Sequence, residues 1–533
     1  MAFAAFQPSA ALGRCIKREG AKVAGGIILL LLFQICWGSS GVLFIRIADE
    51  YKPWHGWALA VCFIGTILLT AATDLMDVQL IPNLYNAMSE EFMTATLETF
   101  EGRRNSPETG KIIGIFSHLH YNAVQLFVNV REYMIPAVLS SIIGIIVLSH
   151  IHPWVGAVFG GSVVVFALTY VAAIYIMQKP VMEQDRCRLD HDQVATDLLL
   201  NIHNIYAVNN TQRQLETFRK DLTVCQQKDQ NYYNAATGAR SLLMIILTLG
   251  FVAPLLMLWH LHHHTKRLPL SAFTSGVFIL AFIREYMFAT VNHLGNMSWY
   301  SAYMLQADQT VRELLYQNDK QPARVLQSTP PADSTIRLQN VVVAELISLP
   351  DVTIAPGDRL VIRGPIGSGK STLLNLLFGK LPYTGSVTIG GVEVRDLDIA
   401  VLRDYFLLIP QTVTLFQNTV YYNIAYGTDA SREQVQALLD KYGITFARLD
   451  DNVGRQGENL SGGQRQLVFL LRGLLHRDKA RIVLMDEPTS ALDEKTRTLA
   501  LGIITELMEN RAAVIVTHDT VLETLGTRVL HLH

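Results

Sequence analysis

The sequence predicts a membrane protein of two parts, an all-α domain with six membrane-spanning helices followed by an α/β domain. Three observations support this prediction. Half of the 533 residues are hydrophobic (50%) and only 17% are charged, with a mean hydropathy of +0.25, which is unusual for a soluble protein. Six long apolar runs lie before Tyr316. After it, short β-branched runs alternate with helical patterns, as is typical of an α/β fold with a largely parallel sheet.

Charge and cysteine usage exclude other classes of protein. The net charge is −2 and the chain has no basic block, so nothing electrostatic predicts a nucleic-acid partner. The cysteines show no C-x-x-C spacing, and we therefore expect reduced or lipid-buried thiols, with neither a disulfide framework nor a cysteine metal site. They are Cys15, Cys36, Cys62, Cys187 and Cys225.

Residues 1–316 form the predicted transmembrane domain. We therefore expect the lipid bilayer to be one of the partners of this chain. A spanning helix needs about 20 apolar residues, so the shorter third and sixth runs must continue into their flanks. The predicted spans lie near 23–45, 56–73, 134–148, 153–177, 241–259 and 270–291.

Loop length and basic residues predict the orientation of these spans. The connections between spans 2 and 3 and between spans 4 and 5 are about sixty residues long and rich in Lys and Arg, whereas the others are short. The positive-inside rule then places the N-terminus, the long loops and the C-terminal domain in the cytoplasm. Helical patterning in Asp192–Leu222 predicts that the spans continue as helices beyond the membrane. A cell or inner membrane is favoured, and the acid-poor N-terminus keeps an organelle membrane as the alternative.

Residues 317–335, rich in Pro, Ser and Asp, form a predicted linker, and residues 336–533 form the predicted nucleotide-binding domain. The buried-type strand Arg359–Arg363 opens into a glycine-rich loop and then a helix. Backbone N–H groups of such a loop bind phosphates, Lys370 reaches the outer phosphate oxygens, and Ser371 offers a hydroxyl to Mg²⁺. The predicted ATP-binding residues here are Gly364, Pro365, Ile366, Gly367, Ser368, Gly369, Lys370, Ser371 and Thr372.

A second apolar strand, Ile482–Met485, leads directly into Asp486 and Glu487. Asp486 is placed to hold Mg²⁺, and Glu487 to polarise the attacking water. The alternative is that these acids merely cap the next helix. Because a P-loop precedes them in the same domain, we favour the catalytic role.

A third element, Leu460–Gln464, opens another helix with a serine and two glycines. This arrangement makes a second anion site at a helix N-terminus. Two such sites on one domain predict that ATP is shared between two copies. The residues expected to contact ATP here are Ser461, Gly462, Gly463 and Gln464.

This set of motifs resembles the ABC transporter superfamily, specifically its exporter-type half-transporters. The resemblance assigns Walker A to Gly364–Ser371, the signature to Leu460–Gln464 and Walker B to Ile482–Glu487. It adds a Q-loop glutamine at Gln411, which also contacts Mg²⁺, a D-loop ending at Asp493, and a switch histidine at His518. It further implies a six-span exporter-type membrane domain whose long loops carry coupling helices.

Three departures from the family pattern stand out. No Phe, Tyr or Trp occurs in Ile336–Arg363, where the family stacks adenine on an aromatic side chain. Arg455 and Gln456 stand where the family has a glutamate before the signature. We also expect no terminal strand or helix after His518, because the sequence ends shortly after it.

The cargo is the least determined feature. Charges at Arg284 and Glu285 lie about 22 Å along span 6 from Leu270, at 1.5 Å per residue, and are expected to face a cavity. Steps of 7 and 11 residues from Glu285 place Asn292 and Asn296 on the same helical face. The alternatives are a structural ion pair, or a span that starts later. Seven histidines at the predicted outer ends could bind metal or sense pH, but an amphipathic interface belt is favoured. They are His55, His150, His152, His260, His262, His263 and His264.

The function predicted by the sequence is an ATP-driven transporter, expected to be an exporter, working with ATP and Mg²⁺ as a dimer of two such chains. A homodimer is favoured over a heterodimer because the hydrolytic set is intact in this chain. An ATP-gated channel or a regulatory membrane ATPase is the alternative. The transported substrate cannot be read from the sequence.

Overall fold

The computed structural model describes residues 6–49, 52–101, 109–316, 327–343, 347–490 and 492–532. They form two compact units, one built mainly of the helices up to Tyr316 and one built mainly of the residues from Gln327 onward. Each unit is described by itself. The expected residues Ala491 of the D-loop and 317–326 of the linker lie outside the described residues.

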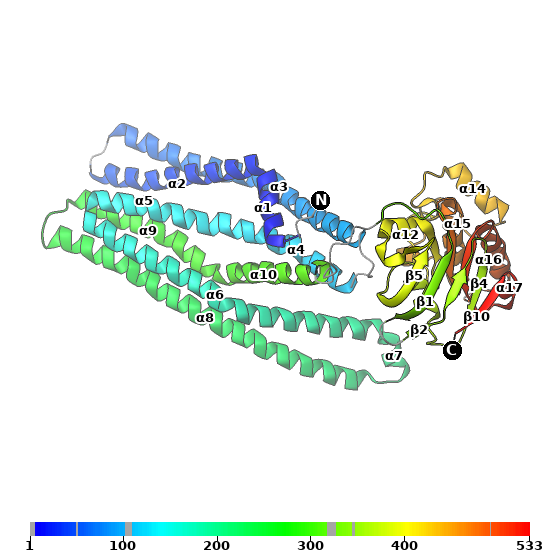
Figure 1. The fold of residues 1–533 in the computed structure, drawn as a ribbon. Coiled ribbons are helices and arrows are strands. Elements are labelled where there is room, and N and C mark those ends of the chain that lie inside the picture. The colour runs from blue at the N-terminus through cyan, green and yellow to red at the C-terminus, as the bar shows by residue number, and fades with distance from the viewer. Residues whose placement is uncertain are drawn as a thin grey trace. The chain divides into compact units, whose positions relative to one another are not determined.

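The first unit is entirely helical (Figure 1). Prolines begin several of its helices, because proline at the first helical position loses no hydrogen bond. The helices are α1 (Pro8–Arg18), α2 (Gly20–Asp49), α3 (Pro53–Glu101), α4 (Thr109–Asn129), a π-helical turn (Val130–Met134), α5 (Ile135–Ile151), α6 (Pro153–Leu200), α7 (Ile202–Ala207), α8 (Thr211–His263), α9 (Leu270–Asn292) and α10 (Leu294–Tyr316).

Within the described residues, six helical stretches are long and apolar enough to cross a membrane. They are Gly20–Gly41, Pro53–Phe100, Ile112–Ile151, Pro153–Leu200, Thr211–His263 and Leu270–Asn292. This confirms the predicted all-α architecture with six spans. With 48 residues, α6 is about 72 Å long at 1.5 Å per residue, far more than a hydrocarbon core of about 30 Å. The apolar runs therefore mark only part of each helix.

The third span contains a charge that sequence analysis counted among the loop residues. Arg131 lies in the π-helical turn and is only 2% exposed. Its Nη1 and Nη2 donate to Oδ1 and Oδ2 of Asp77 in α3, each at 2.5 Å. The contact between the π-helical turn and α3 thus buries the Arg131 side of a bidentate ion pair in a segment that the sequence assigned to a long cytoplasmic loop.

The predicted absence of disulfides is wrong at one position. Cys187 in α6 and Cys225 in α8 form a disulfide, with their Cα atoms 5.6 Å apart. The spacing of the cysteines along the chain could not reveal this pair. The two residues are 38 positions apart and are brought together by the antiparallel packing of two long helices. The three other cysteines, Cys15, Cys36 and Cys62, are free.

The second unit contains two sheets. One is parallel, in the order β10 (Arg528–His531), β4 (Arg359–Arg363), β9 (Ala512–Val516), β8 (Ile482–Asp486) and β7 (Phe406–Ile409). The other is antiparallel and contains β1 (Ile336–Val343), β2 (Ile347–Leu349), β3 (Val352–Ile354), β5 (Tyr383–Ile389) and β6 (Val392–Glu393). The predicted α/β fold is therefore confirmed, with the antiparallel sheet as an addition.

Short helices connect these strands. They are α11 (Lys370–Leu377), α12 (Ile399–Tyr405), α13 (Val420–Ala425), α14 (Arg432–Lys441), α15 (Gly462–His476), α16 (Glu494–Leu507) and α17 (Thr520–Thr524), with 3₁₀ turns at Val394–Asp396 and Arg455–Gly457.

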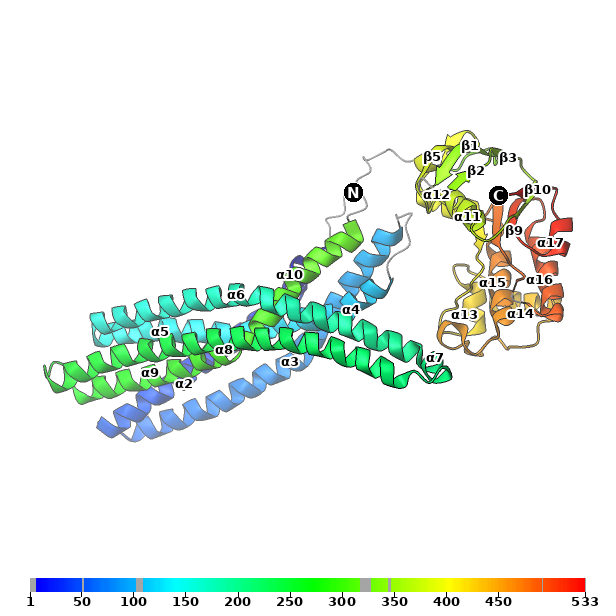
Figure 2. The same cartoon turned by 90° about the horizontal axis from the view of Figure 1, so that it is seen from below.

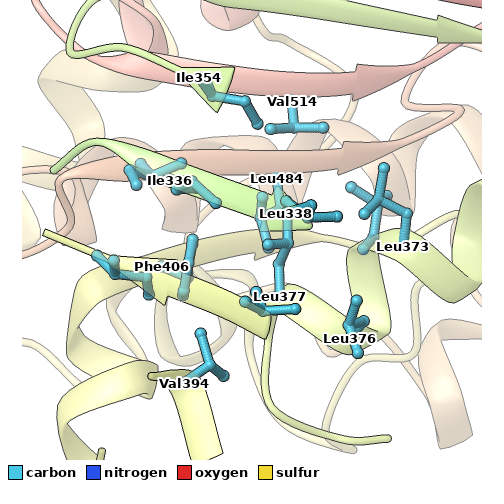
Figure 3. Close-up of a cluster of buried hydrophobic side chains, with 14 of the residues drawn as sticks. Ile336, Leu338, Ile354, Leu373, Leu376, Leu377, Val394, Phe406, Leu484 and Val514 are labelled. Atoms are coloured by element: carbon cyan, nitrogen blue, oxygen red, sulfur yellow. The ribbon is translucent and has the colours of Figure 1, made fainter. Parts of the chain in front are cut away.

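The helix that follows the P-loop is held by the main core of this unit. Leu373, Leu376 and Leu377 of α11 are no more than 1% exposed and belong to one buried cluster with residues of both sheets. Figure 3 shows these leucines beside Leu484 of β8 and Leu338 of β1. Burying such side chains stabilises the fold by about 1.5–3 kcal/mol each. The core therefore fixes the helix end that faces the phosphates.

The expected absence of a strand after His518 is also wrong. Residues Arg528–His531 form β10, which pairs in parallel with β4 from Arg528 against Leu360 to His531 against Arg363. The short helix α17 lies between His518 and this strand. Four residues suffice because each makes its hydrogen bonds on the edge of an existing sheet.

Candidate functional site

The P-loop lies between the buried strand β4 and the helix α11. Gly369 adopts φ 91°, a conformation that glycine reaches without strain. A Cβ atom at Gly369 would also lie 2.8 Å from Cγ2 of Ile347, and one at Gly364 would lie 2.6 Å from the carbonyl oxygen of Leu532. The glycines are thus required by close approach as well as by backbone conformation.

Lys370 is only 9% exposed, and its ammonium lies within the loop. Its Nζ donates to the carbonyl oxygens of Gly364 at 2.8 Å and Pro365 at 2.9 Å. The hydroxyl of Ser368 is buried without a hydrogen-bond partner. A buried hydroxyl without a partner costs free energy, and a phosphate oxygen would satisfy it. Pro365, Ile366, Gly367 and Ser371 are exposed and Thr372 is half-buried.

The predicted catalytic residues meet at the carboxyl ends of three strands. Gln411 follows β7, Glu487 follows β8 and His518 follows β9. Nε2 of Gln411 donates to Oε2 of Glu487 at 3.3 Å, and Nε2 of His518 lies 3.8 Å from Oε1 of the same carboxylate. Glu487 has a positive φ of 45°, and its N–H donates to the carbonyl oxygen of Val516 at 2.8 Å. Such strain in a non-glycine residue is typical of functional sites.

Asp519, next to His518, is a residue to which sequence analysis gave no role. It accepts from Thr489 at 2.9 Å, caps α17, and forms an ion pair with Arg497 of α16. Hydrogen bonds from Arg497 and the other donors lower the pKa of Asp519 to about 2. This carboxylate therefore ties the loop of His518 to the segment that follows Glu487. The available signal was the helix-capping position of an aspartate after a strand.

The signature motif begins α15 with a capping box. Ser461 accepts from the N–H of Gln464 at 3.2 Å, and the Gln464 side chain accepts from the N–H of Ser461 at 2.8 Å. Ser461 and Gly462 are exposed, while Gly463 is buried against Thr496 and Leu492. Asp493 caps α16 through the N–H of Thr496 at 2.9 Å. Within the described residues, no hydrogen bond or ion pair joins residues 461–464 to the P-loop, residues 364–371.

The donor set suits a magnesium ion held together with phosphates. Ser371 offers an exposed hydroxyl at the start of α11, and Asp486 offers a half-buried carboxylate at the end of β8. Mg²⁺ prefers oxygen ligands and usually takes only one or two carboxylates besides phosphates and waters. Nε2 of Gln411 faces Glu487, which leaves its amide oxygen as a third donor. The described residues hold no cluster of three or more His, Cys, Asp or Glu that could bind a metal by itself.

In the membrane half, the predicted cavity residues are all exposed on this single chain. They are Arg284, Glu285, Asn292 and Asn296. The predicted face that joins Glu285, Asn292 and Asn296 extends over two helices, because α9 ends at Asn292 and α10 begins at Leu294. Between them, His293 stacks on Tyr133 with ring centroids 3.6 Å apart. Glu285 and Asn292 therefore share a helix, whereas Asn296 lies beyond this turn.

The outer histidines do not gather into a metal site within the described residues. Nδ1 of His262 lies 2.9 Å from the carbonyl oxygen of Leu268, and its ring stacks on Phe273. His263 stacks on Trp259. These ring contacts are typical of an aromatic belt at a membrane interface.

Fold and site together define a multi-pass membrane protein that carries a P-loop nucleotide-binding domain of the ABC type. Residues 348–490 match the family model described as ABC transporter. The structure is similar to that of a bacterial Atm1-family ABC exporter with ATP bound, with a TM-score of 0.80 at 19% identity over 97% of this chain and 94% of that one. The chain thus has the fold of that exporter, with six membrane-capable helices followed by an α/β domain, as the sequence predicted, and the ABC transporter match of residues 348–490 implies ATP binding.

Curated relatives match about a third of the chain. An ATP-dependent lipid A-core flippase of Burkholderia orbicola (strain AU 1054) is 38% identical over 172 residues, which are 31% of this chain and 29% of the relative. The iron-sulfur clusters transporter ABCB7, mitochondrial, of Rattus norvegicus is 34% identical over 212 residues, 38% of this chain and 28% of the relative. The matches span less than a third of the length of these relatives.

Proposed function

We propose that this chain is an ATP-driven transmembrane transporter, an exporter that works as a dimer of two half-transporters. The observation that carries the proposal is the meeting of Gln411, Glu487 and His518 in the domain that holds the P-loop. The same chain thus contains an intact hydrolytic set and six helices that are able to cross a membrane. The Lys- and Arg-rich long loops support a location in which the N-terminus and the ATPase domain are cytoplasmic.

Each residue has a distinct chemical role in this proposal. Lys370 neutralises phosphate charge once it exchanges the carbonyls of Gly364 and Pro365 for phosphate oxygens. Glu487 accepts a proton from the attacking water, and Gln411 orients its carboxylate. Nε2 of His518 lies 3.8 Å from that carboxylate and would help to hold it in place. Ser371, Asp486 and Gln411 would hold Mg²⁺, which would neutralise charge at the phosphates.

The dimer follows from the separate position of the signature. Ser461 and Gly462 are exposed at the N-terminus of α15, which favours an anion there. A second copy would bring this helix end to the P-loop of the first, so that ATP lies between them. A homodimer suffices, because this chain contains both halves of such a site.

The cargo path is proposed to include the exposed face of α9. Arg284 and Glu285 carry charge within a stretch apolar enough to span the membrane. Charged residues in such stretches usually face a water-filled cavity or one another. Arg240 donates to Asn292 at 2.7 Å, which adds a third charged residue next to this face. A polar or charged cargo therefore fits better than a purely apolar one.

The test is ATPase measurement on the purified chain in lipid vesicles, with and without candidate cargo from four classes: lipids, peptides, drug-like molecules and metal complexes. Stimulation by one class together with its uptake into inverted vesicles would support transport. Hydrolysis accompanied by ion conductance and no uptake would instead favour an ATP-gated channel. The Glu487→Gln variant serves as the inactive control.

A further inference from the structure

The disulfide Cys187–Cys225 joins two helices outside the predicted membrane spans. The predicted spans end at residue 177 in α6 and begin at residue 241 in α8. Beyond these points α6 and α8 run side by side and are connected through α7 (Figures 1 and 2). We call residues 188–224 the distal arm. The disulfide lies at its base.

Polar contacts hold the two helices on the membrane side of the disulfide. Nε2 of Gln184 donates to Oδ1 of Asp229 at 2.6 Å, and Nζ of Lys228 donates to Oε2 of Glu183 at 2.8 Å. Gln184 is only 1% exposed, so the helices pack closely here.

The distal arm has no comparable core. Among its side chains that the structure describes, none is buried. Its ring contact between α6 and α8 is that of His191 with Phe218, whose centroids are 4.5 Å apart. A two-helix hairpin without buried apolar side chains gains little free energy from packing. The covalent bond at its base therefore limits how far the two helices can separate.

The location of the disulfide indicates that it can be reduced. Under the proposed function, the distal arm lies in the cytoplasm, where low-molecular-weight thiols keep most protein cysteines reduced. Disulfides that form there are usually transient or redox-sensing. Both cysteines are half-buried and not enclosed in a core. The Cys225 sulfur lies 3.1 Å from the Cys187 carbonyl oxygen, which is an acceptor close to the thiol that reduction would produce.

We propose that Cys187 and Cys225 are a reversible redox-modification site that reacts with low-molecular-weight thiols and disulfides of the glutathione type. One thiolate attacks the small disulfide and releases one thiol, which leaves a mixed disulfide on the protein. The second cysteine then attacks this bond and releases the second thiol. Two protein thiols and one small disulfide thus become one protein disulfide and two small thiols. The oxidised site fixes the distal arm, and the dithiol frees it.

The experiment uses the full chain in lipid nanodiscs with Cys15, Cys36 and Cys62 replaced by serine. Samples equilibrated in glutathione buffers of increasing GSH to GSSG ratio are quenched in acid, and free thiols are counted by maleimide mass labelling. We expect the two thiols to appear together within the range of cellular glutathione ratios. Hydrogen exchange in residues 192–222 should rise roughly threefold or more on reduction, because local opening becomes easier. Thiols that stay free at every ratio, or unchanged exchange, would overturn the proposal.

Matched variants distinguish effects at this site from effects on ATP hydrolysis. Cys187→Ser/Cys225→Ser should show the exchange of the reduced arm in every buffer, and Cys187→Ser alone should take up one glutathionyl group at Cys225. Basal ATPase is measured on the same samples as a test of the proposed function alone. Absence of ATPase in all samples would instead refute the proposed function and leave the thiol and exchange results standing.

Discussion

Nε2 of Gln411 donates to Oε2 of Glu487 at 3.3 Å, although 76 positions separate these residues in the chain. The contact arises because β7 and β8 are neighbours in a parallel sheet, with Ile409 paired to Met485. Carboxyl ends of neighbouring parallel strands lie at one edge, so the residues that follow them meet. A glutamine fixed in this way can orient the carboxylate without taking its proton.

Replacing Glu487 with glutamine should abolish turnover while ATP binding persists. The amide keeps the shape of the side chain but cannot accept a proton from water, so turnover should fall about 100-fold or more. Steady-state ATPase and equilibrium binding on one preparation check this. Lys370→Ala is the contrasting variant, because it removes a phosphate contact and should weaken binding itself. Glu433→Gln, on an exposed helix start, should leave both properties unchanged. Normal turnover in Glu487→Gln would exclude the proposed role.

Replacing Asp519 with asparagine should destabilise the nucleotide-binding domain and reduce turnover. Asp519 is ion-paired with Arg497, and its side chain is only 9% exposed. Its pKa of about 2 lies below the usual value near 3.9. The stability it contributes is therefore full above about pH 4 and lost as the pH falls through about 2. At pH 7 the loss should be of the order of 1–2 kcal/mol, after allowance for the partly exposed arginine.

The measurement for Asp519→Asn is thermal unfolding of the full chain, with ATPase on the same sample. Glu494→Gln on α16 is the control, since its carboxylate is exposed and forms no ion pair among the described residues. Unfolding at the temperature of the unmodified protein would show that the Asp519–Arg497 pair contributes nothing.

Base selectivity should be weak. The segment Ile336–Arg363 offers no aromatic ring for adenine, and stacking of a base on such a ring contributes about 1–3 kcal/mol. GTP should therefore support hydrolysis within about tenfold of ATP, since about 1.4 kcal/mol corresponds to a factor of ten. Competition of unlabelled GTP and ATP for one labelled nucleotide checks this. A strong preference for ATP would mean that a residue outside this segment supplies the platform.

Glu285→Gln should reduce cargo-stimulated ATPase and leave basal hydrolysis near normal. Glu285 is exposed on this single chain, as is Asn292 seven residues later on the same helix. A residue lining the cargo path contributes to cargo binding and not to ATP chemistry. Basal and stimulated ATPase are measured with the four cargo classes named above, and thermal unfolding on the same sample.

The competing role for Glu285 is a structural one between two chains. If it paired with a buried cation such as Arg284 of a second copy, neutralisation would leave that charge unpaired in the membrane at a cost of several kcal/mol. Stability and basal ATPase would then fall together, and the cargo role would be excluded. Arg240→Gln, next to Asn292, gives a comparison on a neighbouring helix.

Sequence alone determined the features that depend on neighbouring residues. Apolar runs predicted six spans because transfer into a bilayer depends on the hydropathy of consecutive residues. Gly364–Ser371 predicted a phosphate site because one loop and one helix end supply all its donors. The long helices followed from periodicity in Asp192–Leu222. The strand β10 was missed, since four edge residues carry almost no local signal.

Tertiary structure decided the features that depend on packing between distant segments. The pairs Arg131–Asp77, Cys187–Cys225 and Asp519–Arg497 join different elements. Their contacts depend on the register and rotation of one helix or strand against another, which a single sequence does not encode locally. The turn at His293, whose ring stacks on Tyr133 of another helix, also depends on such packing. It places Asn292 in α9 and Asn296 in α10.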